Sequence, residues 1–559
     1  MATKFIAEQF GGMNLLLNPS MIPDKAAQEA TDCELEEGVL NPLRAPKDDG
    51  DGMVGVNSKS MYNYNGTWLS SDNNVDICPV PNQNDKYDRI IMTTNEEAPM
   101  YPVVYSNGAT YRCGIPFTTD VVQAVAQNPP LSGSDLDVET VTYVMTLVDA
   151  WGVEGPPCEP SEFIDRVADT PVNLDLPDAP SGNYNFGSGA LKRVYRSVSG
   201  ASNSVYLGIG EYPITTTSVV DETPVAHAQE PLPSLSWVGP PDDDTTLYPD
   251  GPMIGITQIA NGMMAGFAGR QLCFNEAFLY HAWPPEYRIT MDDPIVAIAS
   301  ITGGLLVVTT KRPYLVSGVH PSSMAVTQIE DKKDENETPS AVSLACVSRH
   351  GMVDMGGYAL YPSPDGLVMV EASTAVVITK NLVTPTQWKG INPSTIRAFS
   401  HEGTYVGFYE GTPNAGFIFD PRRPDTALRL ISPYFECGSY DFDTGRLLVN
   451  DNGTIKSFMG DEDHANGLPY RWKSKRFVAP RQVSLSVARV EAEQPLSTNP
   501  VTMEVHADGV LRDTVIFDED VFQYKRLSSG YRAKRWEFVL TGTNPVVYAG
   551  IFETMDEVI

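Results

Sequence analysis

The sequence has few cysteines, no closely spaced pair of them, and no long apolar run. Its seven cysteines are scattered from Cys33 to Cys437 without a CxxC spacing, so we expect reduced thiols and folding in a reducing cytoplasm. No stretch of about eighteen apolar residues occurs, so we predict no membrane insertion. The first residues, MATKFIAEQFGGMN, have no apolar core of signal-peptide length, which argues against Sec export.

Motifs of common catalytic and metal sites are also missing. There is no GxSxG and no HExxH, and the seven histidines, at positions 227, 281, 320, 350, 401, 464 and 506, are never two or four residues apart. Only His281, close to Trp283, lies in an aromatic setting, and we interpret it as a packed structural imidazole. We therefore predict that the protein is not an enzyme and has no catalytic residues, no cofactor and no metal site.

Two clusters of aspartate and glycine are the nearest approach to a calcium loop. Asp49-Gly50-Asp51-Gly52 and Asp441-Phe442-Asp443-Thr444-Gly445 each offer two carboxylates, without a third ligand or the distal Glu. Tight turns require the same residue types, so turns are the better interpretation. Carboxylate pairs for glycoside hydrolysis can come from different strands and leave no local trace. The Asp-box pattern S-x-D-x-G-x-T-W is absent, however, and Ser363-Pro364-Asp365-Gly366 does not match it.

The charge is strongly negative and unevenly distributed. The chain has 71 acidic and 39 basic residues, a net charge of −32, whereas residues 471 to 559 are balanced. An acidic body repels DNA phosphates, which argues against a conventional nucleic-acid reader, and solubility is the simpler explanation. Basic residues gather at 471–476 and 525–535, where they either pair with an acidic neighbouring subunit or form a solvated face.

Short apolar runs bounded by turn residues indicate an all-β protein. The clearest series, from Asn261 to Gly318, consists of MMAGF, QLCF, IVAIAS, LLVVTT and PYLV, parted by Asn261-Gly262, Ala268-Gly269, Asp292-Asp293-Pro294 and Gly303-Gly304. Sandwiches and propellers are built from such runs. The segment HAWPPEY, residues 281 to 287, contains two prolines that interrupt a ladder, and we interpret it as a rigid connector between blades.

At 559 residues the chain exceeds the size of a single core, and composition divides it into five parts. We predict an extended N-terminal arm at 1–50, with a short helix-capable stretch from Asp24 to Ala30 and a returning strand at 36–40. Next come β units at 51–130, an inserted fibronectin III-like sandwich at 131–238, a β-propeller body at 239–470 and a C-terminal β-sandwich at 471–559. Within the insert, VETVTYVMTLVDAWG predicts one alternating strand.

Local signals inside these parts are turns and one charged loop. A hairpin turn is predicted at Asn65-Gly66, and turns between strands are predicted at Asp508-Gly509 and Ser529-Gly530. The acidic stretch IEDKKDENETPS, residues 329 to 340, is predicted to be a solvated loop.

Several segments together resemble a known family. They are FGGMN and NPSMIPDKAAQEATDCELEEGVLNPLRAP near the start, LVDAWGVEGPPCEPS and VYRSVSG in the insert, NGMMAGFAGRQLCFNEAFLYHAWPPEYRITMDDPIVAI with LLVVTTKRPYLVSGVHPSSM, and YPSPDGLVMV. The chain resembles the tail nozzle, or tail tubular protein B-like, virion proteins of short-tailed bacteriophages.

The resemblance implies a structural virion protein of the tail, a homo-oligomer synthesised in the host cytoplasm. Its copies, typically six, would form a ring that prolongs the DNA channel below the portal and adaptor. The implied partners are further copies, the tail adaptor, other tail proteins and DNA in transient, non-specific passage. An acidic channel wall would let DNA slide, and the arm at 1–50 and the basic patch are candidate clasps between subunits. Deleting residues 1–45 would then leave folded monomers.

Two other functions stay open. A carbohydrate-binding or depolymerising propeller at the tail tip would need exposed aromatic platforms, for which Trp68, Tyr62, Tyr64 and Trp472 are candidates, although aromatic residues of β proteins are usually core. A scaffold propeller for host proteins has no motif in its favour.

Overall fold

The computed structural model describes residues 3–98, 100–130, 137–198, 205–233, 235–331, 343–424, 427–441, 444–460 and 464–555. Strands account for 45% of the structure and helices for 6%, so the prediction of an all-β protein is confirmed. The chain forms two compact units. The larger comprises Met1–Asn74, Ala299–Val316 and Val326–Ile559, and the smaller comprises Val75–Ile298 and Ser317–Ala325.

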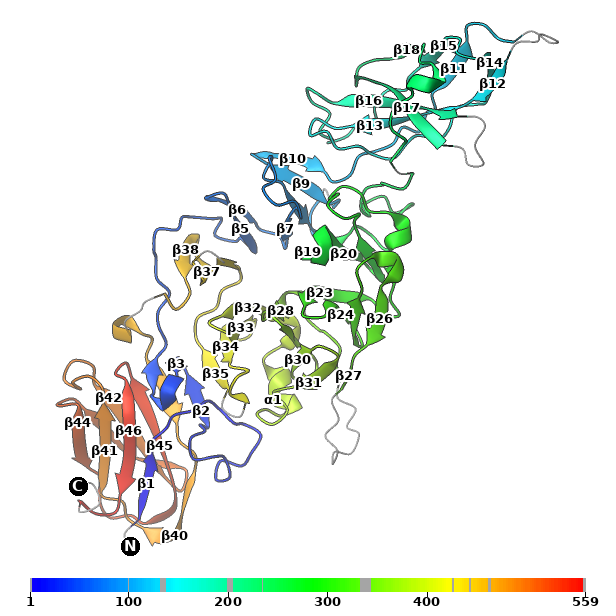
Figure 1. The fold of residues 1–559 in the computed structure, drawn as a ribbon. Coiled ribbons are helices and arrows are strands. Elements are labelled where there is room, and N and C mark those ends of the chain that lie inside the picture. The colour runs from blue at the N-terminus through cyan, green and yellow to red at the C-terminus, as the bar shows by residue number, and fades with distance from the viewer. Residues whose placement is uncertain are drawn as a thin grey trace. The chain divides into compact units, whose positions relative to one another are not determined.

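The larger unit contains several sheets in which consecutive strands pair antiparallel, labelled in Figure 1. One has the order β27-β31-β30-β29-β28, from β27 (Glu330–Asp331), β28 (Val353–Asp354), β29 (Tyr358–Pro362), β30 (Leu367–Glu371) and β31 (Thr374–Val377). Strands β32 (Arg397–His401), β33 (Thr404–Tyr409), β34 (Ala415–Phe419) and β35 (Leu428–Ile431) follow one another at one end of a ten-stranded sheet. A three-stranded sheet consists of β36 (Gly438–Asp441), β37 (Arg446–Asp451) and β38 (Thr454–Ser457). The predicted acidic loop begins as strand β27, and its residues from 332 onward lie outside the described part.

Two hairpins near the N-terminal end also belong to the larger unit. The strands β5 (Ser60–Tyr64) and β6 (Thr67–Ser71) form one, and β3 (Cys33–Glu34) and β4 (Asn41–Pro42) form the other. Asn65 has φ 48° and Gly66 has φ 82°, the left-handed conformations of the predicted hairpin turn, which is confirmed.

The N-terminal segment is not an extended arm, so that prediction was wrong. Strand β1 (Lys4–Ala7) pairs with β46 (Val546–Phe552), and the two lie side by side in Figure 1. Strand β2 (Glu29–Thr31) is paired on both sides, in parallel with β35 and antiparallel with β39 (Tyr470–Lys473). Ala30 is fully buried between the two neighbouring strands, so the backbone hydrogen bonds of this segment are made to those strands. A helix over residues 24–30 would interrupt the sheet at this point.

The C-terminal strands form two sheets that share one core with the N-terminal segment. One has the order β1-β46-β41-β44 and the other β39-β45-β42-β43, with β40 also on β45; their bounds are β40 (Phe477–Val483), β41 (Val487–Ala492), β42 (Val501–Ala507), β43 (Val510–Phe517), β44 (Phe522–Arg526) and β45 (Ala533–Gly542). The second sheet continues through β2 and β35 to β34, β33 and β32, giving ten strands. Residues 471–559 are therefore not a separate unit. The Asp508-Gly509 turn joins β42 to β43 as predicted.

The basic cluster at 471–476 pairs within its own chain. Arg471 contacts Glu29 at 3.0 Å, Lys475 contacts Asp24 at 2.8 Å, and Arg476 contacts Glu537 at 2.5 Å. Two of these carboxylates belong to the N-terminal segment. Arg471 and Lys475, two of the side chains that we considered as clasps for a neighbouring subunit, thus already join the two ends of one chain.

The smaller unit contains two four-stranded sheets. The first consists of β7 (Asp76–Pro79), β8 (Ile90–Thr93), β9 (Val103–Ser106) and β10 (Ala109–Arg112). The second consists of β19 (Ile254–Ile259), β20 (Met263–Ala268), β21 (Gln271–Phe274) and β22 (Ile289–Thr290). The insert forms three sheets: β11 (Gln123–Ala126), β15 (Val172–Asp175) and β18 (Ser218–Asp221); β12 (Val138–Val141) and β14 (Ile164–Val167); and β13 (Tyr143–Val148), β16 (Leu191–Val198) and β17 (Val205–Pro213). The insert therefore begins at β11, before the predicted residue 131.

The single alternating strand predicted in the insert is two strands in different sheets. Strand β12 alternates in exposure, but β13 is buried at all six positions. Residues 155–161 run along β13, because the backbone N–H groups of Gly155, Cys158 and Ser161 donate to its carbonyls. A strand covered in this way needs no polar face, which explains the loss of alternation.

All five runs of the series from Asn261 to Gly318 form the predicted strands: β20, β21, β23 (Ile295–Ile301), β24 (Gly304–Thr309) and β25 (Pro313–Ser317), which β26 (Ala325–Gln328) follows. Asn261 and Gly262 adopt positive φ between β19 and β20. The HAWPPEY segment was assigned wrongly, because it joins β21 to β22, which pair in one sheet, and does not separate two sheets. Its prolines lie in the connection after β21 has ended at Phe274, and Pro285–Tyr287 form a 3-10 turn just before β22.

Helical structure is sparse throughout the described ranges. They contain one α-helix, α1 (Pro385–Gly390), which Thr384 and Gln387 cap reciprocally. No helix among these residues has the length and apolarity needed to cross a membrane. All seven cysteines are buried and free.

Candidate functional site

The first Asp-Gly cluster is occupied by an arginine. Asp49 and Asp51 lie 2.8 and 3.1 Å from the guanidinium of Arg446. In the second cluster, Asp441 accepts a hydrogen bond from Thr444, while Phe442 and Asp443 lie outside the described residues. Within the part of the chain that the structure describes, no three His, Cys, Asp or Glu side chains are placed to hold a metal ion.

The aromatic residues considered as sugar platforms do not form one exposed surface. Trp472 is fully buried, with its ring 4.9 Å from that of Phe10 and its Nε1 donating to the Gly11 carbonyl, so its assignment as a platform was wrong. Tyr64 is also buried. Trp68 is half-buried, and its Nε1 donates to the Asp51 carbonyl at 2.6 Å. The sequence could not distinguish these cases, since burial of Trp472 depends on a residue more than 400 positions away.

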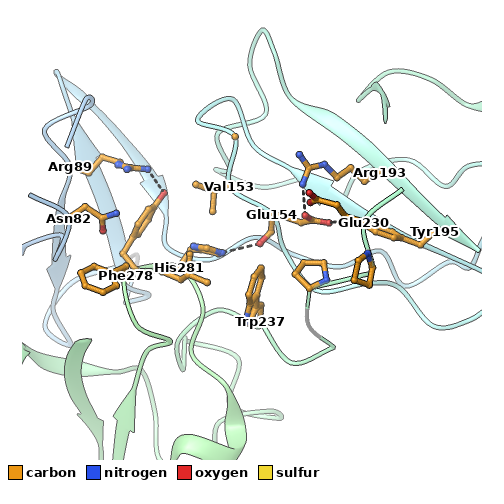
Figure 2. Close-up of a pocket in the computed structure, with 15 residues that line it drawn as sticks. Asn82, Arg89, Val153, Glu154, Arg193, Tyr195, Glu230, Trp237, Phe278 and His281 are labelled. Atoms are coloured by element: carbon orange, nitrogen blue, oxygen red, sulfur yellow. Dashed lines mark hydrogen bonds and ion pairs between the residues drawn. The ribbon is translucent and has the colours of Figure 1, made fainter. Parts of the chain in front are cut away.

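A cavity in the smaller unit brings polar and aromatic side chains together, as Figure 2 shows. Its volume is about 380 Å³, within the range of small-molecule sites, ~300–1,000 Å³. Five segments line it: Asn82 and Arg89 between β7 and β8, Val153 and Glu154 after β13, Arg193 and Tyr195 on β16, Glu230 and Trp237 after β18, and Phe278 to His281 after β21.

His281 lies at the centre of this lining with one nitrogen satisfied. The side chain is 2% exposed, its Nε2 lies 2.9 Å from the Glu154 carbonyl oxygen, and its ring packs edge-on against Tyr280 and Trp237. The predicted packing is thus confirmed. Burial lowers the pKa of His281 to about 4, so the neutral ring donates from Nε2. Its Nδ1 is then a buried acceptor, and it has no hydrogen-bond partner among the described residues.

Arg89 is held at one end of the cavity. Its guanidinium contacts both carboxylate oxygens of Asp85, at 2.5 and 2.8 Å, and donates to the Tyr280 hydroxyl at 3.1 Å. It also lies 4.6 Å from the centre of the Tyr280 ring. Burial, more than the neighbouring charges, raises the pKa of Tyr280 and keeps its hydroxyl protonated.

Glu154 is saturated by three donors at the other end. Thr146, Tyr195 and Arg193 each donate to its carboxylate at 2.6 Å. A carboxylate fixed in this way is a poor candidate for an acid or base, because each donor competes with a reacting proton.

Two acceptors of the lining remain without donors. One is His281 Nδ1 and the other is the Asn82 side-chain oxygen, both buried and both without a partner in the described ranges. Buried polar atoms are rarely left unsatisfied, so each calls for an explanation. Of the lining residues only His281 was singled out from the sequence. The others lie in five distant segments and leave no local signal.

No protein-family model and no curated protein matches this chain. Among solved structures it is similar to an exo-β-1,3-galactanase from Phanerochaete chrysosporium, with a TM-score of 0.20 and 9% identity over 53% of this chain and 94% of that one. Virginiamycin B lyase from Staphylococcus aureus gives a TM-score of 0.26 and 10% identity, over 69% and 98%. The extracellular domain of the one component system BT4673 from B. thetaiotaomicron gives 0.28 and 10%, over 98% and 82%. Structural similarity this weak gives no information about the function of this chain.

Proposed function

We propose that this protein is a structural component of a bacteriophage tail, a ring of identical copies that forms part of the DNA ejection conduit. The observation that carries the proposal is the resemblance to tail nozzle proteins, whose segments follow one another from FGGMN to YPSPDGLVMV along most of the chain. We further propose a β-propeller-like body with a fibronectin III-like insert and a C-terminal sandwich. Short antiparallel sheets of sequential strands are what such a body requires.

The negative charge supports a conduit rather than a DNA-binding surface. With a net charge of −32, the protein offers few sites at which phosphates would be held. A wall of the same sign as DNA keeps the polymer hydrated and moving, whereas a basic wall would retain it in a salt-dependent manner. We propose that acidic side chains line the channel.

An apolar surface on the C-terminal sheets supports self-assembly. Val510, Leu511 and Ile516 on β43, and Phe522 and Tyr524 on β44, are 40 to 52% exposed. We call these five residues the sheet-edge patch. Strands β43 and β44 contact each other, and each is the last strand of its sheet, so their outer backbone groups are open to pairing. Exposed apolar side chains on open edges are typical of interaction sites, and a ring of like subunits would cover them.

Two variants of the full-length chain test this proposal. Replacing Ile516 and Tyr524 by Glu places charge in the sheet-edge patch, and we expect monomers in sedimentation velocity where the unaltered chain forms a ring. The matched control is Val125→Glu, at a 64% exposed valine on β11, which should leave the ring intact. Rings of unchanged size in the patch variant would contradict the role of the patch, and an unaltered chain that stays monomeric would contradict the ring.

A further inference from the structure

The cavity around His281 is a binding site without an occupant assigned to it. We propose that it binds a neutral sugar residue, with Trp237 as the stacking surface and with His281 Nδ1 and the Asn82 oxygen as acceptors for ligand hydroxyls. This inference goes beyond the tail-ring proposal and does not depend on it, because every lining residue belongs to one compact unit of a single chain.

The hydrogen-bond inventory calls for a ligand that donates. His281 Nε2 is committed to the Glu154 carbonyl, so Nδ1 has only a lone pair to offer. The Asn82 oxygen is likewise an acceptor, and neither atom finds a donor among the described residues. Anionic ligands such as phosphate present mainly acceptors and would leave both atoms unsatisfied. Hydroxyl groups donate and accept, which suits these atoms and the guanidinium groups nearby.

The charges of the lining favour a neutral ligand over an ion. Arg89 is matched by Asp85, and Arg193 is matched by Glu154 at 2.6 Å and by Glu211 at 2.6 Å. Glu230 is exposed and forms no ion pair within the described ranges, so it lies at the edge rather than in the interior. No uncompensated charge is therefore buried in the cavity to attract an ion.

Aromatic surface supplies the remaining requirement. Trp237 is half-buried and Phe278 is 55% exposed, so both rings are partly open to a ligand, and Figure 2 shows them on either side of His281. The apolar C–H face of a sugar ring stacks on such surfaces while its hydroxyl edge meets polar atoms. The volume of about 380 Å³ accommodates a small ligand of this kind.

Binding is measured on the full-length chain by saturation-transfer NMR and calorimetry, with glucose, galactose, N-acetylglucosamine and rhamnose as probes. We expect saturable binding of at least one of them with a Kd of about 1 mM or tighter. Trp237→Ala should weaken it about tenfold, the loss of one stacking surface. The control Phe163→Ala removes a 77% exposed aromatic ring outside the lining of the cavity and should leave the affinity unchanged.

A second pair of measurements separates a sugar from a cation. Glu230→Gln removes a carboxylate of the lining that has no ion pair among the described residues, and sugar affinity should change less than about threefold. Tetramethylammonium serves as the cation probe. Tighter binding of this ion than of any sugar, lost in Glu230→Gln, would overturn the proposal. So would the absence of saturable binding by all four sugars at about 20 mM to protein whose melting curve is cooperative. Should Trp237→Ala not fold, Asn82→Ala takes its place with the same expected loss.

Discussion

The inserted sheets of the smaller unit and the C-terminal sheets of the larger unit bury different side chains. In the insert, Arg166, Arg196 and Asp221 are at most 1% exposed. Arg196 contacts Asp221 at 2.5 Å, Arg166 lies 3.8 Å from it, and the Tyr143 hydroxyl donates to it at 2.8 Å. The interior of the C-terminal sheets is mainly aromatic and aliphatic, with Trp472 packed near Phe538.

The difference teaches how each region resists change. A buried ion network contributes little net stability but makes the loss of one member costly, because its partner charge stays buried and unpaired. An apolar core responds to volume instead. The insert should therefore be sensitive to charge and pH, and the C-terminal sheets to cavities and to loss of the N-terminal strands.

Deletion of residues 1–32 has the largest expected effect. It removes β1 and β2, and β2 is an interior strand of the ten-stranded sheet, so β35 and β39 lose their common neighbour. We expect loss of the cooperative melting transition of the larger unit, measured by calorimetry. The interpretation of residues 1–50 as an arm predicts folded monomers after the deletion. Folded monomers would therefore contradict an essential role of β2 between β35 and β39.

Trp472→Ala tests the apolar core alone. Removing a fully buried indole should lower the free energy of unfolding by about 3–5 kcal/mol, with no dependence on pH between about 5 and 8. Urea unfolding at several pH values measures both. A loss below about 1 kcal/mol would mean that this interior is not tightly packed.

Asp221→Asn tests the ion network with almost no change of volume. The buried guanidinium of Arg196 loses its charge partner, and we expect about 3–5 kcal/mol of destabilisation. Hydrogen exchange should localise the effect to the inserted sheets, with β42 and β45 unchanged. Equal exchange in both regions would show that they do not unfold separately.

The pH dependence of the cavity follows from His281. Desolvation depresses its pKa to about 4 in the folded protein from an ordinary value of 6.5. The unfolded chain therefore binds the proton more readily, so the contribution to stability is complete above about 6.5 and is lost as the pH falls towards 4. Protection factors of amides around β21, which correct for the intrinsic pH dependence of exchange, should fall as the pH drops from about 6.5 towards 4, and His281→Gln should remove this fall. A variant with the same pH profile would assign the effect to another group.

The smallest effect is expected at the surface. Arg471 and Glu29 form an ion pair in which both side chains are about 45% exposed. Arg471→Ala should cost less than about 1 kcal/mol, since solvent screens the pair. Urea unfolding of Arg471→Ala and of Asp221→Asn under the same conditions compares the two losses of unfolding free energy. A much smaller loss in Arg471→Ala would show that burial of the ion pair, rather than its charge, determines the loss.

Local signals in the sequence predicted much of the fold, and long-range pairing limited the rest. The runs around Met263 and Leu305 became strands, and Asn65-Gly66 became a hairpin turn, because these features depend on neighbouring residues. The pairing of Lys4 with Phe552 joins the two ends of the chain and has no local trace. The cavity is similar: His281 stood out through its aromatic neighbours, whereas Asn82 became a candidate only when folding left its oxygen buried.

Electron microscopy of the assembled protein, alone and in virions, decides whether the copies form a tail ring. We expect a closed ring, sixfold as in the family that the chain resembles, with a central opening lined by acidic side chains, located in the tail. Particles that remain monomeric, a ring whose inner wall is neutral with the acids outside, or a position away from the tail axis would contradict it.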